Sequence, residues 1–210
     1  MLVSAAVAGC ASAQPPEGQT MTARVVERAQ LRAAPAGRVV APVGRFTEYG
    51  DRRVYRVVAR RDGWIAVLAP ERPNGRAGWI AADHAVLGAV RWSITVDRSA
   101  RRLTLRRSGR VVRRMLVTVG ARSSPTPLGR FAVTDKLWME QGSVYGCCAL
   151  ALSGNQTRGR LAGVRLAIHG TRVPERLGLA ASNGCARATA RDLRRLMRTV
   201  PRGTPVTVVR

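Results

Sequence analysis

Short apolar runs rich in β-branched residues, separated by turn signals, recur along this chain and constrain its fold more than any other feature. Gly, Pro and Asn-Gly turns separate the runs, and none outside the N-terminal segment is long and apolar enough to cross a bilayer. Strands at this close spacing are typical of small barrels and sandwiches. The sequence therefore predicts a mainly β fold.

The first group of runs lies in residues 24–88 and predicts a small all-β barrel. Its runs are Val25-Val26, Leu31, Val39-Val40, 54–58, 64–68 and 78–80. We expect Trp64 and Trp79 to belong to the core of this barrel rather than to a binding surface. Residues 81–90 are expected to link the barrel to the second half of the chain.

The second group of runs lies in residues 89–210 and predicts a β domain with one or two short helices. Its strands are expected at 92–96, 101–107, 110–119, 130–134, 147–152, 164–168 and 204–209, with a hairpin turn at Ser108-Gly109. The strand at 164–168 would present His169 at its end.

One helix is expected near residue 190. Thr189 and Asp192 have the spacing of a capping box, which marks a helix start. The apolar residues that follow recur with the helical period, so we expect one buried helix face. They are Leu193, Leu196, Met197 and Val200.

The first fourteen residues are small and apolar and resemble the end of an export signal. Residues 7–10 resemble a lipobox, in which Cys10 would carry a lipid and anchor the chain to a membrane. Residues 11–13 fit equally well an ordinary signal peptidase site. We therefore expect residues 1–23 to be a signal or lipoprotein-type segment with a short linker. The protein would then be exported to the cell envelope, in the periplasm or the cell wall.

The net charge of the chain is +24 and belongs mainly to its second half. Residues 1–88 carry 12 basic and 7 acidic residues, whereas residues 89–210 carry 24 and 5. Nucleic acid is the first partner that such a charge suggests. However, the chain has no recognisable nucleic-acid motif, and an aromatic content of 4% leaves few stacking platforms. We expect no nucleic-acid partner, and an anionic cell wall or membrane surface accounts for the charge equally well.

The stretch from His169 to Arg187 contains the residues that can do chemistry. The Cys185 thiol is nucleophilic only as a thiolate, and a free pKa of about 8.5 means that it needs a base. Imidazole, with a pKa of about 6.5, can accept that proton and return it later. Gly184 leaves room for an acyl group and allows a sharp turn, so nearby amides could face an oxyanion. A free cysteine is, however, often only a small buried hydrophobe.

The motifs around these residues favour a catalytic pair. Residues 168–171 read Ile-His-Gly-Thr and residues 182–187 read Ser-Asn-Gly-Cys-Ala-Arg. Together with Ser-Pro-Thr-Pro-Leu-Gly-Arg-Phe upstream and Gly-Thr-Pro-Val downstream, they closely resemble the L,D-transpeptidase (YkuD-type) catalytic domain. Asn183 departs from the family pattern, since many members have a second His there, and Ala186 stands where a larger aliphatic residue is common.

The resemblance implies a YkuD-type β-sandwich and a cysteine-dependent acyltransferase that cross-links peptidoglycan stem peptides through a thioester. Cys185 would be the nucleophile, and His169 would donate and accept the proton. Four neighbours are expected to support them: Gly170 by orienting the imidazole through its carbonyl, Ser182 by holding the loop, Gly184 by providing space and amides, and Arg187 by binding a substrate carboxylate or bracing the loop. We expect a monomer that needs no cofactor and no metal.

Other functions of the same site stay open. It could trim stem peptides by admitting water, as an L,D-carboxypeptidase, or attach a protein to the wall. A wall-binding lipoprotein with a silent catalytic fold is a non-enzymatic alternative, against which the intact His169 and Cys185 argue.

The first half also resembles a known domain. Residues 31–35, 63–67 and 78–80 are similar to a bacterial SH3-like domain. Such domains often bind wall peptides beside a catalytic domain, and a spacer without a ligand is the equal alternative.

Cys147 and Cys148 are adjacent, and adjacent cysteines do not bond each other easily. In a strand, one would face inward and the other outward, so we expect them to serve packing. A disulfide with Cys185 would silence the enzyme in an oxidising compartment.

Overall fold

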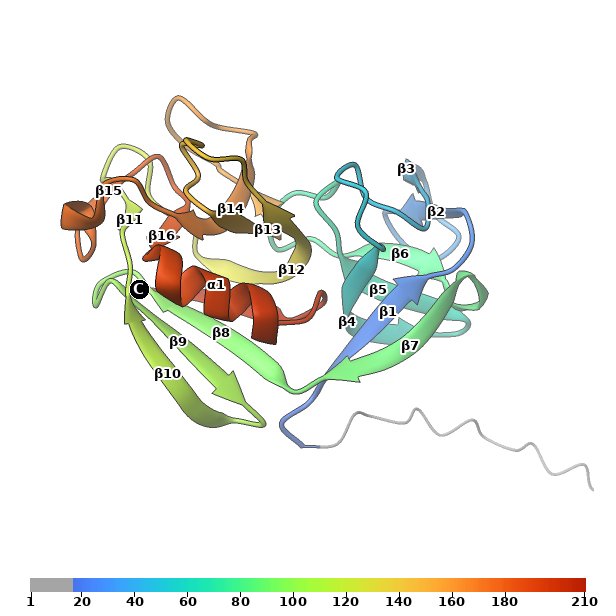
Figure 1. The fold of residues 1–210 in the computed structure, drawn as a ribbon. Helices are drawn as coiled ribbons and strands as arrows, with labels where there is room; N and C mark the ends of the chain where they lie inside the picture. The colour runs from blue at the N-terminus through green and yellow to red at the C-terminus, as the bar shows by residue number, and fades with distance from the viewer. Residues whose placement is uncertain (1–16) are drawn as a thin grey trace, which may run out of the picture.

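The computed structural model describes residues 17–210 of the chain, and Figure 1 shows these residues as two sheets side by side with a helix packed on the second. The predictions for residues 1–14, including those for Cys10, therefore lie outside the described residues. No helix in the described part of the chain is long and apolar enough to span a membrane. The prediction of a mainly β fold is confirmed.

The first sheet is antiparallel, and its seven strands within the described residues follow the order β3-β2-β6-β5-β4-β1-β7. Its elements are β1 (Thr20–Val25), β2 (Ala29–Arg32), β3 (Val39–Val43), β4 (Val54–Arg61), β5 (Trp64–Leu68), β6 (Gly78–Ala81), the 3-10 turn η1 (Ala82–His84) and β7 (Ala85–Val90). Leu31, Tyr55 and Ile65 are fully or almost fully buried members of its own hydrophobic cluster.

Three expectations for this half are wrong. Most of the expected linker at 81–90 is strand β7, which pairs with β1 along its whole length. β1 in turn begins at Thr20, inside the segment expected to be the N-terminal linker. Trp64 and Trp79 are only half-buried. Trp64 begins β5 next to a hairpin turn, where its ring lies 6.0 Å from the guanidinium of Arg32 rather than in the core.

The second sheet has eight strands within residues 17–210, in the order β10-β9-β8-β17-β12-β13-β14-β16. They are β8 (Trp92–Asp97), β9 (Arg102–Arg107), β10 (Arg110–Leu116), β12 (Gly129–Trp138), β13 (Cys148–Asn155), β14 (Arg165–Gly170), β16 (Ala186–Ala188) and β17 (Pro205–Val209). β8 pairs with β17, and β14 with β16, in parallel, whereas the other pairs are antiparallel. A separate parallel pair is formed by β11 (Val119–Gly120) and β15 (Ala180–Ser182), next to the 3-10 turn η2 (Pro174–Arg176).

The helix α1 (Ala190–Thr199) begins where the sequence predicts. The Thr189 hydroxyl accepts the backbone N–H of Asp192 at 3.0 Å and donates to the Asp192 carboxylate at 3.0 Å. This contact satisfies one of the free amides of the first turn, and a cap of this kind contributes about 1 kcal/mol. The capping prediction is therefore confirmed.

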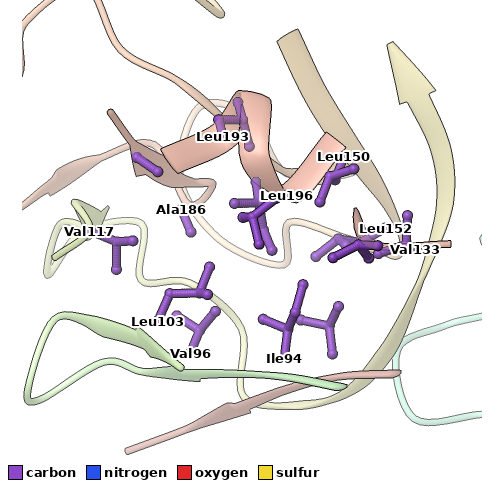
Figure 2. Close-up of a cluster of buried hydrophobic side chains, with 14 of the residues drawn as sticks. Ile94, Val96, Leu103, Val117, Val133, Leu150, Leu152, Ala186, Leu193 and Leu196 are labelled. Atoms are coloured by element: carbon purple, nitrogen blue, oxygen red, sulfur yellow. The ribbon is translucent and has the colours of Figure 1, made fainter. Parts of the chain in front are cut away.

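The apolar face of α1 fills the space enclosed by the second sheet. Figure 2 shows Leu193 and Leu196 pointing into a cluster shared with Ile94 and Val96 of β8 and with Leu150 of β13. Burying each such side chain contributes about 1.5–3 kcal/mol. The helix thus fixes β13, and with it β14, over the strands that precede them in the chain.

Candidate active site

Strand β14 is the strand on which the candidate site is built. Its residue His169 pairs with Ala149 of β13 on one side and with Arg187 of β16 on the other. Cys185 directly precedes β16, and the parallel register therefore places it beside Ala167, two residues before His169 on β14. The pairing of β14 with β16 therefore brings His169 and Cys185, which are separated in the sequence, to neighbouring strands.

His169 is held in one tautomer by its own strand. Its side chain is buried, with the residue only 4% exposed, and Nδ1 lies 2.6 Å from the backbone carbonyl oxygen of Gly170. Because a carbonyl only accepts hydrogen bonds, Nδ1 carries the proton and donates it. Nε2 of the neutral ring is then left as the basic nitrogen.

Burial lowers the pKa of His169 to about 4, because the charged imidazolium loses its solvation. Hydrogen bonds to the backbones of Gly170 and Tyr145 raise the pKa and offset part of this effect, while the positive charge of Arg187 lowers it further. At neutral pH the imidazole is therefore neutral and able to accept a proton.

Burial also affects Cys185, whose thiol becomes charged by losing a proton, whereas imidazole becomes charged by gaining one. Burial raises the pKa of the Cys185 thiol, while a hydrogen bond with the backbone of Ala167 and the charge of Arg187 work in the lowering direction. The resting pair is a neutral thiol and a neutral imidazole, which avoids holding two buried charges. Cys185 therefore needs a base at the moment of reaction.

The turn before Cys185 is held by Ser182. The Ser182 hydroxyl donates to the carbonyl oxygen of Cys185 at 2.7 Å and accepts the N–H of Gly184 at 3.1 Å. Ser182 is itself buried, with 2% of its surface exposed. Both hydrogen-bonding functions of this hydroxyl are thus used within the turn.

Gln156 is a residue that the sequence reasoning missed. It follows β13, is 3% exposed, and its Nε2 donates to the carbonyl oxygens of Asn183 at 2.8 Å and Ser124 at 3.1 Å. Gly184 has a φ of +122°, and a Cβ built on it would overlap Gln156 Nε2. Glycine is therefore required at 184 both by its backbone and by this side chain. A single Gln in a polar segment gives no pattern that could have revealed it.

Tyr145 is a second residue that the sequence did not single out. Its ring meets the ring of His169 edge to face, with centroids 5.1 Å apart and an interplanar angle of 81°. Gly146 packs so closely on the chain that a Cβ there would lie 2.8 Å from the Cα of Gly170. The loop before β13 thus covers the His169 side of the site, while Tyr145 itself stays 43% exposed.

Arg187 fulfils one of the two roles expected for it, the bracing of the loop. Its backbone braces the strand, since its N–H and carbonyl both bond to Thr118 at 2.9 Å. Its side-chain Nε is buried and has no hydrogen-bond partner within residues 17–210. A buried donor without a partner is uncommon in folded proteins and is a mark of a functional position.

The expectation that Cys147 and Cys148 face opposite ways is wrong. β13 begins only at Cys148, so strand alternation does not extend to Cys147, and the two sulfur atoms lie 2.7 Å apart. Cys148 is fully buried and Cys147 partly exposed, and both are free thiols, as is Cys185. Within the described residues, no group of three or more His, Cys, Asp and Glu is arranged to hold a metal ion.

Comparison with known proteins places these residues in a family. The model of the YkuD L,D-transpeptidase catalytic domain matches residues 91–208. The chain is 30% identical to a Bacillus subtilis (strain 168) protein provisionally named L,D-transpeptidase YkuD. This alignment extends over 151 residues, which are 69% of this chain and 86% of the relative. A Bacillus licheniformis protein of the same name is 28% identical over 148 residues, covering 67% and 84%.

A solved structure gives a weaker match. The L,D-transpeptidase from Mycobacterium smegmatis aligns with a TM-score of 0.46 and 18% identity, over 66% of this chain and 76% of that one.

Proposed function

The chain belongs to the YkuD family of L,D-transpeptidase catalytic domains, and we propose that it cross-links peptidoglycan stem peptides through a thioester on Cys185. The observation that carries this proposal is the arrangement of β14 and β16. It places Cys185 next to the strand of His169, whose Nδ1 is bonded to Gly170 and whose Nε2 is left as a base.

In the first half-reaction, Nε2 of His169 accepts the Cys185 proton as the sulfur attacks a carbonyl of a stem tetrapeptide. The carbon–sulfur bond forms, and the bond to the terminal D-alanine breaks. His169 gives the proton to the departing amine. The Gly184 N–H is engaged by Ser182, so we assign the oxyanion chiefly to the backbone N–H of Cys185.

In the second half-reaction, an amine of a neighbouring stem attacks the thioester. Its proton passes to His169, the new amide bond forms, and the Cys185 sulfur leaves and recovers a proton from His169. We assign to Arg187, whose Nε has no hydrogen-bond partner within residues 17–210, the binding of a carboxylate of the stem peptide, a pairing that is stronger than a neutral hydrogen bond.

The test is mass spectrometry of muropeptides after purified protein is incubated with tetrapeptide-rich peptidoglycan. We expect cross-linked dimers together with free D-alanine. Tripeptides without dimers would instead establish an L,D-carboxypeptidase, and a carrier protein joined to the stem would establish wall attachment. A wild-type protein that yields none of these products would be a silent wall-binding protein.

A carbapenem provides a second test that does not depend on the acceptor. We expect one adduct on the intact protein and its location on Cys185 by peptide mapping. An adduct on Cys147 or Cys148 would overturn the assignment of the nucleophile.

We also propose that the protein works at the cell envelope. The 24 basic and 5 acidic residues of the second half suit an anionic wall or membrane surface. Binding to isolated walls should weaken with salt, because exposed charges are screened over about 10 Å at 0.1 M. The full-length chain recovered from the cytosol after fractionation would contradict this location.

The first sheet, which resembles an SH3-like domain in sequence, is proposed either to bind wall peptides or to act as a spacer. Residues 17–90, produced alone if they fold, would bind isolated stem peptides in the first case and not in the second.

A further inference from the structure

We propose that Gln156 positions the turn from Ser182 to Cys185 (the nucleophile turn), and that the first sheet holds Gln156 in place through Asn74. This inference rests on the proposed function, since it concerns the same Cys185. It gives the first sheet a role in the reaction that does not require it to bind any ligand.

The contact between Gln156 and the turn fixes a backbone rather than a side chain. The Gln156 amide binds the carbonyl of Asn183, two residues before Cys185, and at the same time the carbonyl of Ser124 on the facing loop. Its Oε1 accepts the N–H of Thr157 at 2.8 Å, so the orientation of the amide is set. Buried amides with all partners satisfied hold one conformation.

The residue before Gln156 is bonded to the first sheet. Asn74, in the loop between β5 and β6, donates to the Asn155 carbonyl at 2.7 Å and accepts the Asn155 N–H at 2.9 Å. The side chain of Asn155 donates to the Pro70 carbonyl at 3.1 Å. An asparagine side chain thus pairs with this backbone as a neighbouring strand would, and it fixes the end of β13 from which Gln156 extends.

Other polar contacts also join the two sheets, and one of them reaches Arg165, which pairs with Asn155 across β13 and β14 but does not contact the turn before Cys185. Asp51 accepts the backbone N–H of Lys136 at 2.8 Å and pairs with Arg202 at 2.6 Å, and Glu48 pairs with Arg165. These contacts lie on β12, β14 and the turn before β17, and none involves Gln156. They supply a matched control, because they join the same two sheets without touching the nucleophile turn.

The experiment compares Gln156→Ala, Asn74→Ala and the control Glu48→Gln in the full chain. We expect kcat to fall about 10- to 100-fold for Gln156→Ala and several-fold for Asn74→Ala, with KM nearly unchanged, because small misplacements of reacting groups have costs of this size. Glu48→Gln should stay within about twofold, since an exposed ion pair contributes little. Thermal unfolding of each variant verifies that it is folded.

A second readout follows Cys185 itself, by iodoacetamide labelling at increasing pH and peptide mapping. A loosened turn admits water, so the pH midpoint of Cys185 labelling should move down towards about 8.5 in Gln156→Ala. The inference is overturned if folded Gln156→Ala retains wild-type kcat and midpoint, or if Asn74→Ala behaves as Glu48→Gln does. Failure of the proposed function would look different, because wild-type protein would then form no product while the labelling shift remained.

A separate observation concerns the two thiols at the start of β13, and we infer that Cys147 and Cys148 form a redox-sensitive dithiol. Their sulfur atoms are 2.7 Å apart, and Cys147 is partly exposed beside Tyr145-Gly146, the loop that touches His169 and Gly170. Adjacent cysteines can bond each other only with strain, and strained disulfides are the labile ones that reduction reverses easily, so the contact fits a reversible disulfide rather than a structural one.

The reaction is exchange with a small disulfide such as oxidised glutathione. The Cys147 thiolate attacks one sulfur and releases one thiol, and Cys148 then attacks the Cys147 sulfur and releases the second. The two protons of Cys147 and Cys148 end on the released thiols, and the small disulfide is reduced by two electrons. Burial, together with the hydrogen bond to Cys147, raises the pKa of Cys148 to about 12, so Cys147 is the thiol that attacks first.

The test treats the protein with oxidised glutathione, alkylates the remaining thiols and maps the peptides. We expect the peptide with Cys147 and Cys148 to lose two hydrogen atoms and to stay unalkylated, and transpeptidation to slow and recover with dithiothreitol. Cys147→Ser should abolish both effects. A lasting glutathione adduct on Cys147 with Cys148 still alkylated, a disulfide that includes Cys185, or an oxidised enzyme of unchanged rate would each overturn the inference.

Discussion

Two cysteine-bearing segments flank the same strand, β14, and differ in what holds them. Cys185 ends a turn fixed by Ser182 and Gln156, and it lies on the side of β14 that pairs with β16. Cys148 begins β13 on the other side, and its side chain belongs to the hydrophobic cluster under α1. Cys185 is partly exposed as a residue, whereas Cys148 is completely buried.

The difference teaches that a thiol becomes a candidate nucleophile through its backbone setting. Both segments lie one strand away from His169, so proximity to the histidine strand does not distinguish them. What distinguishes them is that the turn before Cys185 is held by the side chains of Ser182 and Gln156, and that the charge of Arg187 acts on the Cys185 thiol.

The largest effect should follow from Cys185→Ala, which removes the proposed nucleophile from the first of the two cysteine segments. Turnover should fall at least about 1000-fold, since losses of this size follow removal of a nucleophile. Muropeptide analysis measures it, with far-UV circular dichroism as the folding control. Residual cross-linking at the wild-type rate would mean that a different group attacks.

His169→Ala tests the strand between the two segments. Acylation by a carbapenem should slow by about 100- to 10,000-fold at neutral pH, the usual contribution of a general base. Part of the rate should return at higher pH, where more Cys185 ionises unaided. Stopped-flow rates across pH measure this recovery, and a uniform loss at every pH would argue that His169 does not act as the base.

The burial of His169 should also make the stability of the fold depend on pH. The pKa is about 4 in the folded protein and about 6.5 in the unfolded chain, so the unfolded chain binds more protons between these values. Stability is then complete above about pH 6.5 and is lost as the pH falls towards 4, by up to about 3 kcal/mol. Urea unfolding near pH 7 and near pH 4 measures the loss. His169→Gln should reduce it, and an unchanged loss would place its origin in other groups.

The smallest effect on activity is expected from the second cysteine segment. Under reducing conditions Cys147→Ala should keep activity within about twofold, and Cys148→Ala should lower the free energy of unfolding by about 1–2 kcal/mol, because it removes a buried sulfur. Activity assays with dithiothreitol and urea unfolding measure the two. A Cys147→Ala enzyme as inactive as Cys185→Ala would erase the contrast between the segments.

The parts of the fold that follow a local pattern could be predicted, and the parts that depend on distant pairing could not. The capped helix and its buried face follow from Thr189 and a regular apolar repeat, and His169 and Cys185 were singled out by their motifs. The three-residue strand β16 has no pattern of its own and exists because β14 is beside it. The same holds for Gln156 and Tyr145, whose importance lies only in what they touch across the fold. Strand β7 likewise cannot be predicted from its own residues, because its partner β1 lies far back in the chain.

The position of β17 in the second sheet has a consequence for how the protein folds. β17 lies between β8, the first strand of that sheet in the chain, and β12, although it follows every other strand of the sheet in sequence. The sheet therefore stays in two pieces until β17 arrives, and contacts of such high sequence separation slow folding. While the chain is still growing on the ribosome, β8 and β12 remain unjoined edges, and they stay open to aggregation until β17 is made.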